Sequence, residues 1–92
     1  MPTVKRTRVV VSGRVQGVFF RATCARLARE AGVGGYVRNR SDGGVEAAFE
    51  GTNDAVDRMV DWCRSGPELA RIDEVEAVAE DPVGDISFRV VH

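Results

Sequence analysis

The sequence predicts an α+β fold in which two helices cover one face of an antiparallel sheet. Two segments carry apolar residues at helical spacing, and the segments around them alternate apolar and polar residues as strands do. The pair Asp42-Gly43 separates two of the alternating segments and is typical of a tight hairpin turn, because both residues tolerate positive φ angles. One sheet face is the simplest surface against which both helical stripes can be buried.

The first two elements are a strand and a helix. Residues 7–12 contain three consecutive valines before Gly13, which predicts a buried central strand. A helix is expected to start at Phe20 and to end at Gly32. Its predicted apolar face repeats at intervals of three and four residues and comprises Phe20, Cys24, Leu27, Ala28 and Ala31.

A hairpin of two strands comes next. Residues 35–40 contain Tyr36 and Val37 in a short β-type run, and residues 45–50 alternate apolar side chains with acidic or small ones. The turn between them, residues 41–44, contains the Asp-Gly pair. We therefore expect these two strands to be antiparallel neighbours.

The second helix is expected from Thr52 or Asn53, either of which can cap its N-terminus, through Arg64, and Gly66-Pro67 ends it. Its apolar stripe comprises Val56, Met59, Val60 and Cys63. Cys24 and Cys63 thus both fall on apolar helical faces. We interpret them as small buried hydrophobic residues in a reducing compartment, not as metal ligands or a disulfide.

Two further strands complete the predicted fold. Residues 72–80 carry three apolar residues on one strand face, namely Val75, Ala77 and Ala79. A shorter last strand alternates Ile86, Phe88 and Val90 with other residues. The resulting order, βαββαβ plus a short terminal strand, is that of the ferredoxin-like split βαβ arrangement. The sequence contains no linker or repeat, so residues 1–92 are expected to form a single domain.

Formal charge is distributed unevenly along the chain. Residues 1–40 carry nine Lys or Arg and one Glu, whereas residues 41–92 carry four Lys or Arg and thirteen Asp or Glu. Because the two halves of a single domain interleave in space, ordinary solvated charge explains this split better than a basic face that steers an anionic partner, although the second interpretation stays open. The sequence shows no secretion signal and no apolar run of membrane length, so we expect a cytoplasmic protein with no membrane partner.

The most informative segment is the loop Gly13–Arg21 between the first strand and the first helix. Gly13 and Gly17 permit turns that direct several N–H groups inward, and Arg21 offers a planar guanidinium beside the positive end of the helix dipole. Together these features favour binding of a phosphate dianion. A glycine-containing loop is more often a simple connection, however, and the P-loop and dinucleotide-binding patterns are both missing from the sequence, so nucleotide binding is not expected.

The remaining residue types limit the reaction on a bound phosphate. His92 is the only histidine and the last residue, and we interpret it as a frayed end rather than a general base. Neither cysteine begins the Cys-x5-Arg pattern of a cysteine-dependent phosphatase, and no acidic cluster in the sequence suggests a two-metal site. An acyl phosphate needs neither an acid nor a metal for its cleavage, because its leaving group is a carboxylate, which is stable at neutral pH.

Asn39 is the candidate for orienting the attacking water. Strand alternation places Asn39 on the same face as Val37 and opposite Arg38 and Arg40. A carboxamide can donate to one water and accept from it at the same time, which suits an orienting role without base strength. A turn-prone asparagine near the end of a hairpin is the competing interpretation.

The chain resembles the acylphosphatases over essentially its whole length. The motifs that carry this resemblance are Gly13–Arg21, Gly35–Asn39, Asp42–Glu46 and Phe49-Glu50-Gly51. The resemblance implies a ferredoxin-like fold, hydrolysis of the carboxyl-phosphate bond of a small acyl phosphate, and no metal or organic cofactor. It also implies that Arg21 and Asn39 are catalytic. The amides that it implies for substrate binding are those of Val15, Gln16, Gly17, Val18, Phe19 and Phe20.

Two other functions fit parts of the sequence. A non-catalytic ferredoxin-like module could bind an anion or present aromatic residues to RNA. Phe49 and Phe88 alternate as core residues do, and Tyr36 is the one strand aromatic that could be exposed, so we expect no nucleic-acid partner. The chain could also be the acylphosphatase-like domain of a larger carbamoyl-transferring maturation enzyme. Its Met1 and its ending lead us to expect a free-standing protein, which we take to be a monomer.

Overall fold

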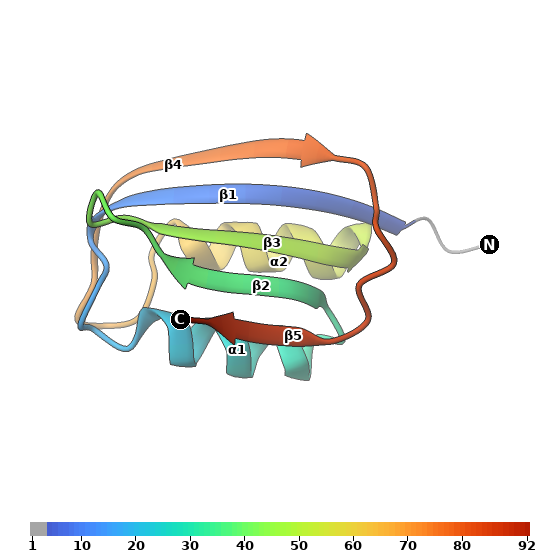
Figure 1. Ribbon diagram of the computed structural model, residues 1–92, viewed down its shortest axis with the longest axis horizontal. Helices are drawn as coiled ribbons and strands as arrows, with labels where there is room; N and C mark the ends of the chain where they lie inside the picture. Colours follow the sequence, from blue (N-terminus) through green and yellow to red (C-terminus); the bar gives the residue numbers. More distant parts are fainter. Residues whose placement is uncertain (1–3) are drawn as a thin grey trace.

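The computed structural model describes residues 4–92 and has two layers, a five-stranded sheet and two helices (Figure 1). The strand order in the sheet is β4-β1-β3-β2-β5, in which β5 runs parallel to β2 and all other pairs are antiparallel. The predicted ferredoxin-like arrangement is confirmed, with one parallel pair added at the edge. The elements are β1 (Val4–Arg14), α1 (Phe20–Glu30), β2 (Gly34–Asn39), β3 (Val45–Thr52), α2 (Asn53–Cys63), β4 (Arg71–Glu80) and β5 (Phe88–Val91).

Strand β1 extends beyond the predicted residues 7–12 at both ends, because its polar residues also pair with the neighbouring strands. Arg6, for example, lies opposite Glu50 of β3 and Glu80 of β4. The register with β4 shifts beside Gly13, which has a φ of 126°. A Cβ atom at Gly13 would lie 2.1 Å from the carbonyl oxygen of Arg71. Glycine is therefore required at this irregularity near the end of β1, where the strand still pairs with β4.

The helices begin and end near their predicted positions. Thr52, one of the two predicted caps, accepts the N–H of Ala55 on its Oγ1 at 3.3 Å, so α2 begins after it. Ala31 was expected on the apolar face of α1, but it is exposed because the helix ends at Glu30 and the chain turns there. In the part of the chain that the structure describes, no helix is long and apolar enough to span a bilayer.

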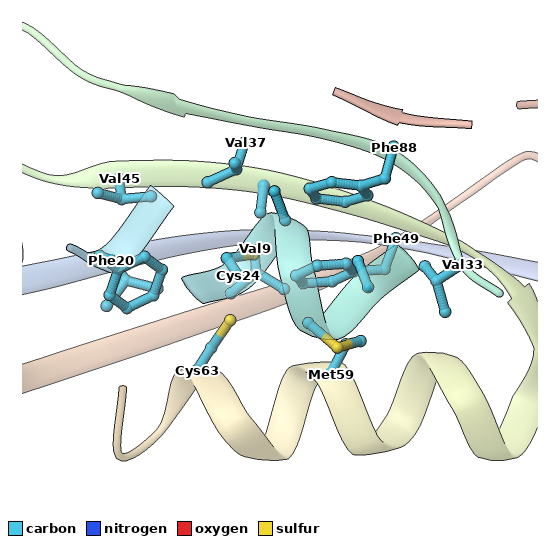
Figure 2. Close-up of a cluster of buried hydrophobic side chains, with 14 of the residues drawn as sticks. Val9, Phe20, Cys24, Val33, Val37, Val45, Phe49, Met59, Cys63 and Phe88 are labelled. Atoms are coloured by element: carbon cyan, nitrogen blue, oxygen red, sulfur yellow. The ribbon is translucent and has the colours of Figure 1, made fainter. Parts of the chain in front are cut away.

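The core lies between the sheet and the two helices (Figure 2). Phe49 of β3 and Phe88 of β5 stack with their ring centroids 5.7 Å apart, and both are buried, as the sequence predicted. Cys24 and Cys63 are free thiols inside this core. Burial raises the pKa of Cys63 to about 12 and that of Cys24 well above its ordinary value, so neither is a thiolate at neutral pH. Their interpretation as buried hydrophobic residues is confirmed.

The last part of the chain connects the two edges of the sheet. Residues 81–87 run from β4, around the end of the sheet, to β5 (Figure 1). The prediction that Ile86 belongs to the last strand is wrong, because Ile86 precedes β5 and is 94% exposed. Ala77 and Ala79 share a strand but are exposed as well, since β4 is an edge strand with little cover. Val75 packs partly against the core.

Basic residues of the first half pair with acidic residues of the second half. The guanidinium of Arg6 lies 3.1 Å from Glu50 and 3.0 Å from Asp85. Burial raises the pKa of Glu50, but the N–H groups of Val83 and Gly84 and the Arg6 guanidinium outweigh this effect, so the pKa lies below its ordinary value. This pairing favours ordinary structural charge over a basic steering face.

Candidate active site

The loop between β1 and α1 carries backbone amide groups that have no partner among residues 4–92. The N–H groups of residues 16–19 donate no hydrogen bond to any described residue, and no side chain caps the first turn of α1. Gly17 and Phe19 have φ angles of 73° and 64°, which is the left-handed region. Alternating left-handed residues turn successive N–H groups into a concave nest. Together with the helix N-terminus, this loop forms a cradle suited to an anion.

Arg21 and Asn39 line one cavity beside this loop. Its volume is about 260 Å³, and both side chains are half-buried at its wall. Arg21 comes from the first turn of α1, and Asn39 is the last residue of β2. The structure thus brings together the two residues that were predicted to be catalytic. The lining residues are Val15, Gly17, Phe19, Phe20, Arg21, Ala22 and Asn39.

Asn39 is held at the strand end by charges on the opposite sheet face. Arg38 and Arg40 both reach Glu46 of β3, at 2.9 and 3.4 Å. Burial raises the pKa of Glu46, but hydrogen bonds from Tyr36 and Arg38 lower it below its ordinary value, so the carboxylate stays charged. The predicted alternation about Asn39 is confirmed, and the two arginines fix the strand on either side of it.

Gln16 links the loop to the hairpin that follows Asn39. Its Nε2 donates to the carbonyl oxygens of Arg40 and Gly44 at 2.8 and 2.9 Å. Neither Gln16 nor Val18 lines the cavity, because the first side chain points to the hairpin and the second is buried in the core. The substrate-binding role predicted for these two residues therefore concerns their backbone N–H groups. A single glutamine in a loop gives no signal of such a link in the sequence.

His92 contacts Arg21. The Nη1 atom of Arg21 lies 3.3 Å from the Nδ1 atom of His92, which follows β5. Across residues 4–92, no carboxylate forms an ion pair with Arg21. His92 lies beyond the last strand and is exposed, as expected of a chain end, but its ring lies against Arg21. Nothing in the sequence pattern places the last residue beside the first helix.

The structure also bears on the other functions considered. Within the described part of the chain, no three His, Cys, Asp or Glu side chains lie close enough together to hold a metal ion. Phe49 and Phe88 are buried, and the hydroxyl of the half-buried Tyr36 donates to Glu46. The described strands therefore present no stack of exposed aromatic rings of the kind that binds RNA bases on such a sheet.

The fold and the cavity define a ferredoxin-like domain in which a loop of unpaired amides, an arginine and an asparagine meet. The acylphosphatase family model matches residues 7–90. An acylphosphatase of Roseiflexus sp. is 53% identical over 85 residues, which covers 92% of this chain and 91% of that protein. The chain belongs to the acylphosphatase family and is an enzyme of that family.

Solved structures show the same relationship. The crystal structure of acylphosphatase from Bacillus subtilis matches with a TM-score of 0.91 at 30% identity, covering 98% of this chain and 100% of that one. The HypF structure from T. kodakarensis matches with a TM-score of 0.82 at 34% identity, covering 96% of this chain but 12% of that one. The same fold thus occurs as a whole chain and as a small part of a much longer one.

Proposed function

We propose that this protein hydrolyses the carboxyl-phosphate bond of small acyl phosphates to a carboxylate and inorganic phosphate. The observation that carries the proposal is the meeting of three groups at one cavity. Within residues 4–92, these are the unpaired N–H groups of the loop residues 16–19, of which Gly17 and Phe19 line the cavity, the guanidinium of Arg21, which pairs with no carboxylate, and the carboxamide of Asn39. Membership of the acylphosphatase family supports the same reaction.

The loop amides and Arg21 bind the phosphoryl group in this proposal. In phosphoryl transfer the charge of the loose transition state spreads over the equatorial oxygens, and fixed donors around these oxygens stabilise it. The donors are oriented before substrate arrives, because the left-handed residues Gly17 and Phe19 and the start of α1 set the loop geometry. One well-placed donor of this kind contributes about 100- to 1,000-fold in turnover.

Asn39 orients the water that attacks phosphorus. The water oxygen forms a bond to phosphorus while the bond from phosphorus to the acyl oxygen breaks, and the electron pair of that bond leaves with the carboxylate. The proton of the water passes to a phosphate oxygen or to solvent. Neither a general acid nor a metal is required, because a carboxylate with an ordinary pKa near ~4 is a good leaving group at neutral pH.

Hydrolysis of benzoyl phosphate by matched variants tests this mechanism. Arg21→Ala is expected to lower kcat/KM by about 1,000-fold or more and to abolish inhibition by inorganic phosphate. Arg14→Ala is the control, since Arg14 is an exposed arginine in the same segment that does not line the cavity. Asn39→Ala is expected to lower kcat strongly while phosphate still inhibits, whereas the exposed Asn53→Ala keeps full activity. A folded Arg21→Ala variant with parent kinetics would exclude the proposed role.

The proposal extends to three finer properties, which are the need for a metal, the location and the oligomeric state. We propose metal-free catalysis from the chemistry of the leaving group, and a chelator should then leave turnover unchanged. We further propose a cytoplasmic monomer, since the free thiols of Cys24 and Cys63 suit a reducing compartment. Gel filtration should place the protein near its chain mass of 10.0 kDa. Activity lost on chelation, or elution at twice that mass, would contradict these points.

A further inference from the structure

The final residue of the chain reaches the active-site cavity through a neighbouring side chain. Strand β5 lies parallel to β2, with Val91 paired to Arg38, so both strands end at the same side of the sheet (Figure 1). His92 follows β5 directly, and its Nδ1 lies 3.3 Å from Nη1 of Arg21. His92 does not line the cavity itself. Any influence on the reaction must therefore act through Arg21.

The chemistry of this contact suits an arginine that must keep its charge. A neutral imidazole accepts a hydrogen bond from the guanidinium without cancelling the positive charge. Arg6 and Arg38, by contrast, form ion pairs with carboxylates, which offset the positive charge of their guanidinium groups. An imidazole partner thus fixes the direction of the Arg21 guanidinium while leaving its charge available to a phosphate dianion.

We propose that His92 is a positioning residue that orients Arg21 when its ring is neutral and releases Arg21 when it is protonated. This inference rests on the proposed function of Arg21. Protonated imidazole has no free acceptor, and it places a second cation beside the guanidinium. Histidine side chains change charge between about pH 5 and 8. Activity should therefore depend on pH through the contact between His92 and Arg21.

The other charged groups near β5 have partners of their own. The elements that pack against β5 are α1 and β2. In α1, Arg26 pairs with Glu30, and Arg29 donates to the carbonyl oxygen of Phe88. Arg38 of β2 is bonded to Glu46, and Arg89 of β5 pairs with Asp85, which precedes the strand. Arg21 is the charged side chain that shares a hydrogen bond with the ring.

Two substitutions at His92 test separately whether its ring acts as a hydrogen-bond acceptor and whether its charge matters. His92→Gln keeps a side-chain oxygen that can accept from Arg21 but does not ionise between pH 5 and 8. His92→Phe keeps a ring but offers no acceptor. Both variants keep the backbone at this exposed position, so the fold should be unaffected, and thermal unfolding checks this. The measurement is kcat/KM for benzoyl phosphate from pH 5 to pH 8, together with the inhibition constant of inorganic phosphate.

The expected result is a ratio of parent to His92→Gln activity that falls by about threefold or more between pH 8 and pH 5. Ionisation of the substrate cancels in this ratio, because it is common to both proteins. His92→Phe should be less active than His92→Gln at every pH, and phosphate should inhibit it more weakly. Parallel pH profiles of parent and His92→Gln, or equal activity of the Gln and Phe variants, would overturn the inference.

Failure of the proposed function gives a different pattern. If the parent does not hydrolyse benzoyl phosphate, the proposed reaction fails, and calorimetric binding of inorganic phosphate to the same three proteins still tests His92. Binding to the parent that weakens at low pH relative to His92→Gln supports the inference. Binding with the same pH dependence in both contradicts it.

Discussion

Replacing Gln16 tests how the phosphate loop is held against the end of β2. Gln16→Met keeps the length of the side chain but cannot donate the two hydrogen bonds to Arg40 and Gly44, which measure 2.8 and 2.9 Å. Each such bond contributes about 0.5–1.5 kcal/mol, so the expected loss is about 1–3 kcal/mol in the free energy of unfolding. For a domain of this size, 1 kcal/mol corresponds to about 4–8 °C in Tm.

Thermal unfolding followed by circular dichroism measures this loss, and benzoyl phosphate kinetics measure its consequence. Because Gln16 fixes the loop relative to the strand that carries Asn39, kcat should fall by about tenfold or more, since small misplacements of reacting groups are costly. Inhibition by phosphate should change less. Ser12→Ala serves as the control, because Ser12 is exposed and its hydroxyl lies 3.5 Å from its nearest partner. Gln16→Met with parent Tm and parent kcat would refute the reasoning.

Three further outcomes follow from the structure. Phe19 has a left-handed backbone and a ring that is 72% exposed. Phe19→Gly should therefore relieve about 1–2 kcal/mol of backbone strain with little loss of packing, and Tm should not fall. A large decrease in Tm would contradict this. The pKa of Glu50 is lowered in the folded state, so its charged carboxylate stabilises the fold above the ordinary pKa of 4.5. This stabilisation is lost as the pH falls through the lowered pKa, so the Tm of Glu50→Gln should vary less between pH 6 and pH 3 than the Tm of the parent. Gly13→Ala should lower the free energy of unfolding in urea by about 1–3 kcal/mol more than Gly43→Ala, because a Cβ at Gly13 would clash with the backbone of Arg71. Equal losses in the two variants would contradict this packing.

Local patterns predicted the elements, but not how they are placed across the chain. Helical periodicity located α1 and α2, and the Asp42-Gly43 turn located the β2–β3 hairpin, because these signals depend on neighbouring residues. The parallel pairing of β5 with β2 joins segments that are far apart in sequence, and no local signal encodes it. Ile86 was misassigned for the same reason, since alternation alone cannot show where the connection ends and the strand begins.

The residues of the candidate site were likewise predicted only in part. Arg21 and Asn39 were found because a glycine-containing loop before a helix and a polar residue in a strand are features of their own segments, and the structure places both at one cavity. The links that hold them were missed. Gln16 and His92 act through contacts to distant segments, and neither residue type indicates its partner in the sequence.

The uneven charge of the two halves also became interpretable only in three dimensions. Arg6 and Arg38 belong to the basic half, and both pair with acidic residues of the second half in the folded sheet. Arg21 is different, because its described hydrogen-bond partner is an imidazole. The charge available to a substrate is thus a property of one side chain and its surroundings rather than of the basic half.

The most direct test of the phosphate cradle is a ¹H–¹⁵N NMR titration with inorganic phosphate. We predict saturable shifts at the backbone amides of residues 16–20 and at the Nε–H of Arg21, with smaller changes over β4. Saturating shifts confined to another surface, with the loop amides unmoved, would contradict the account.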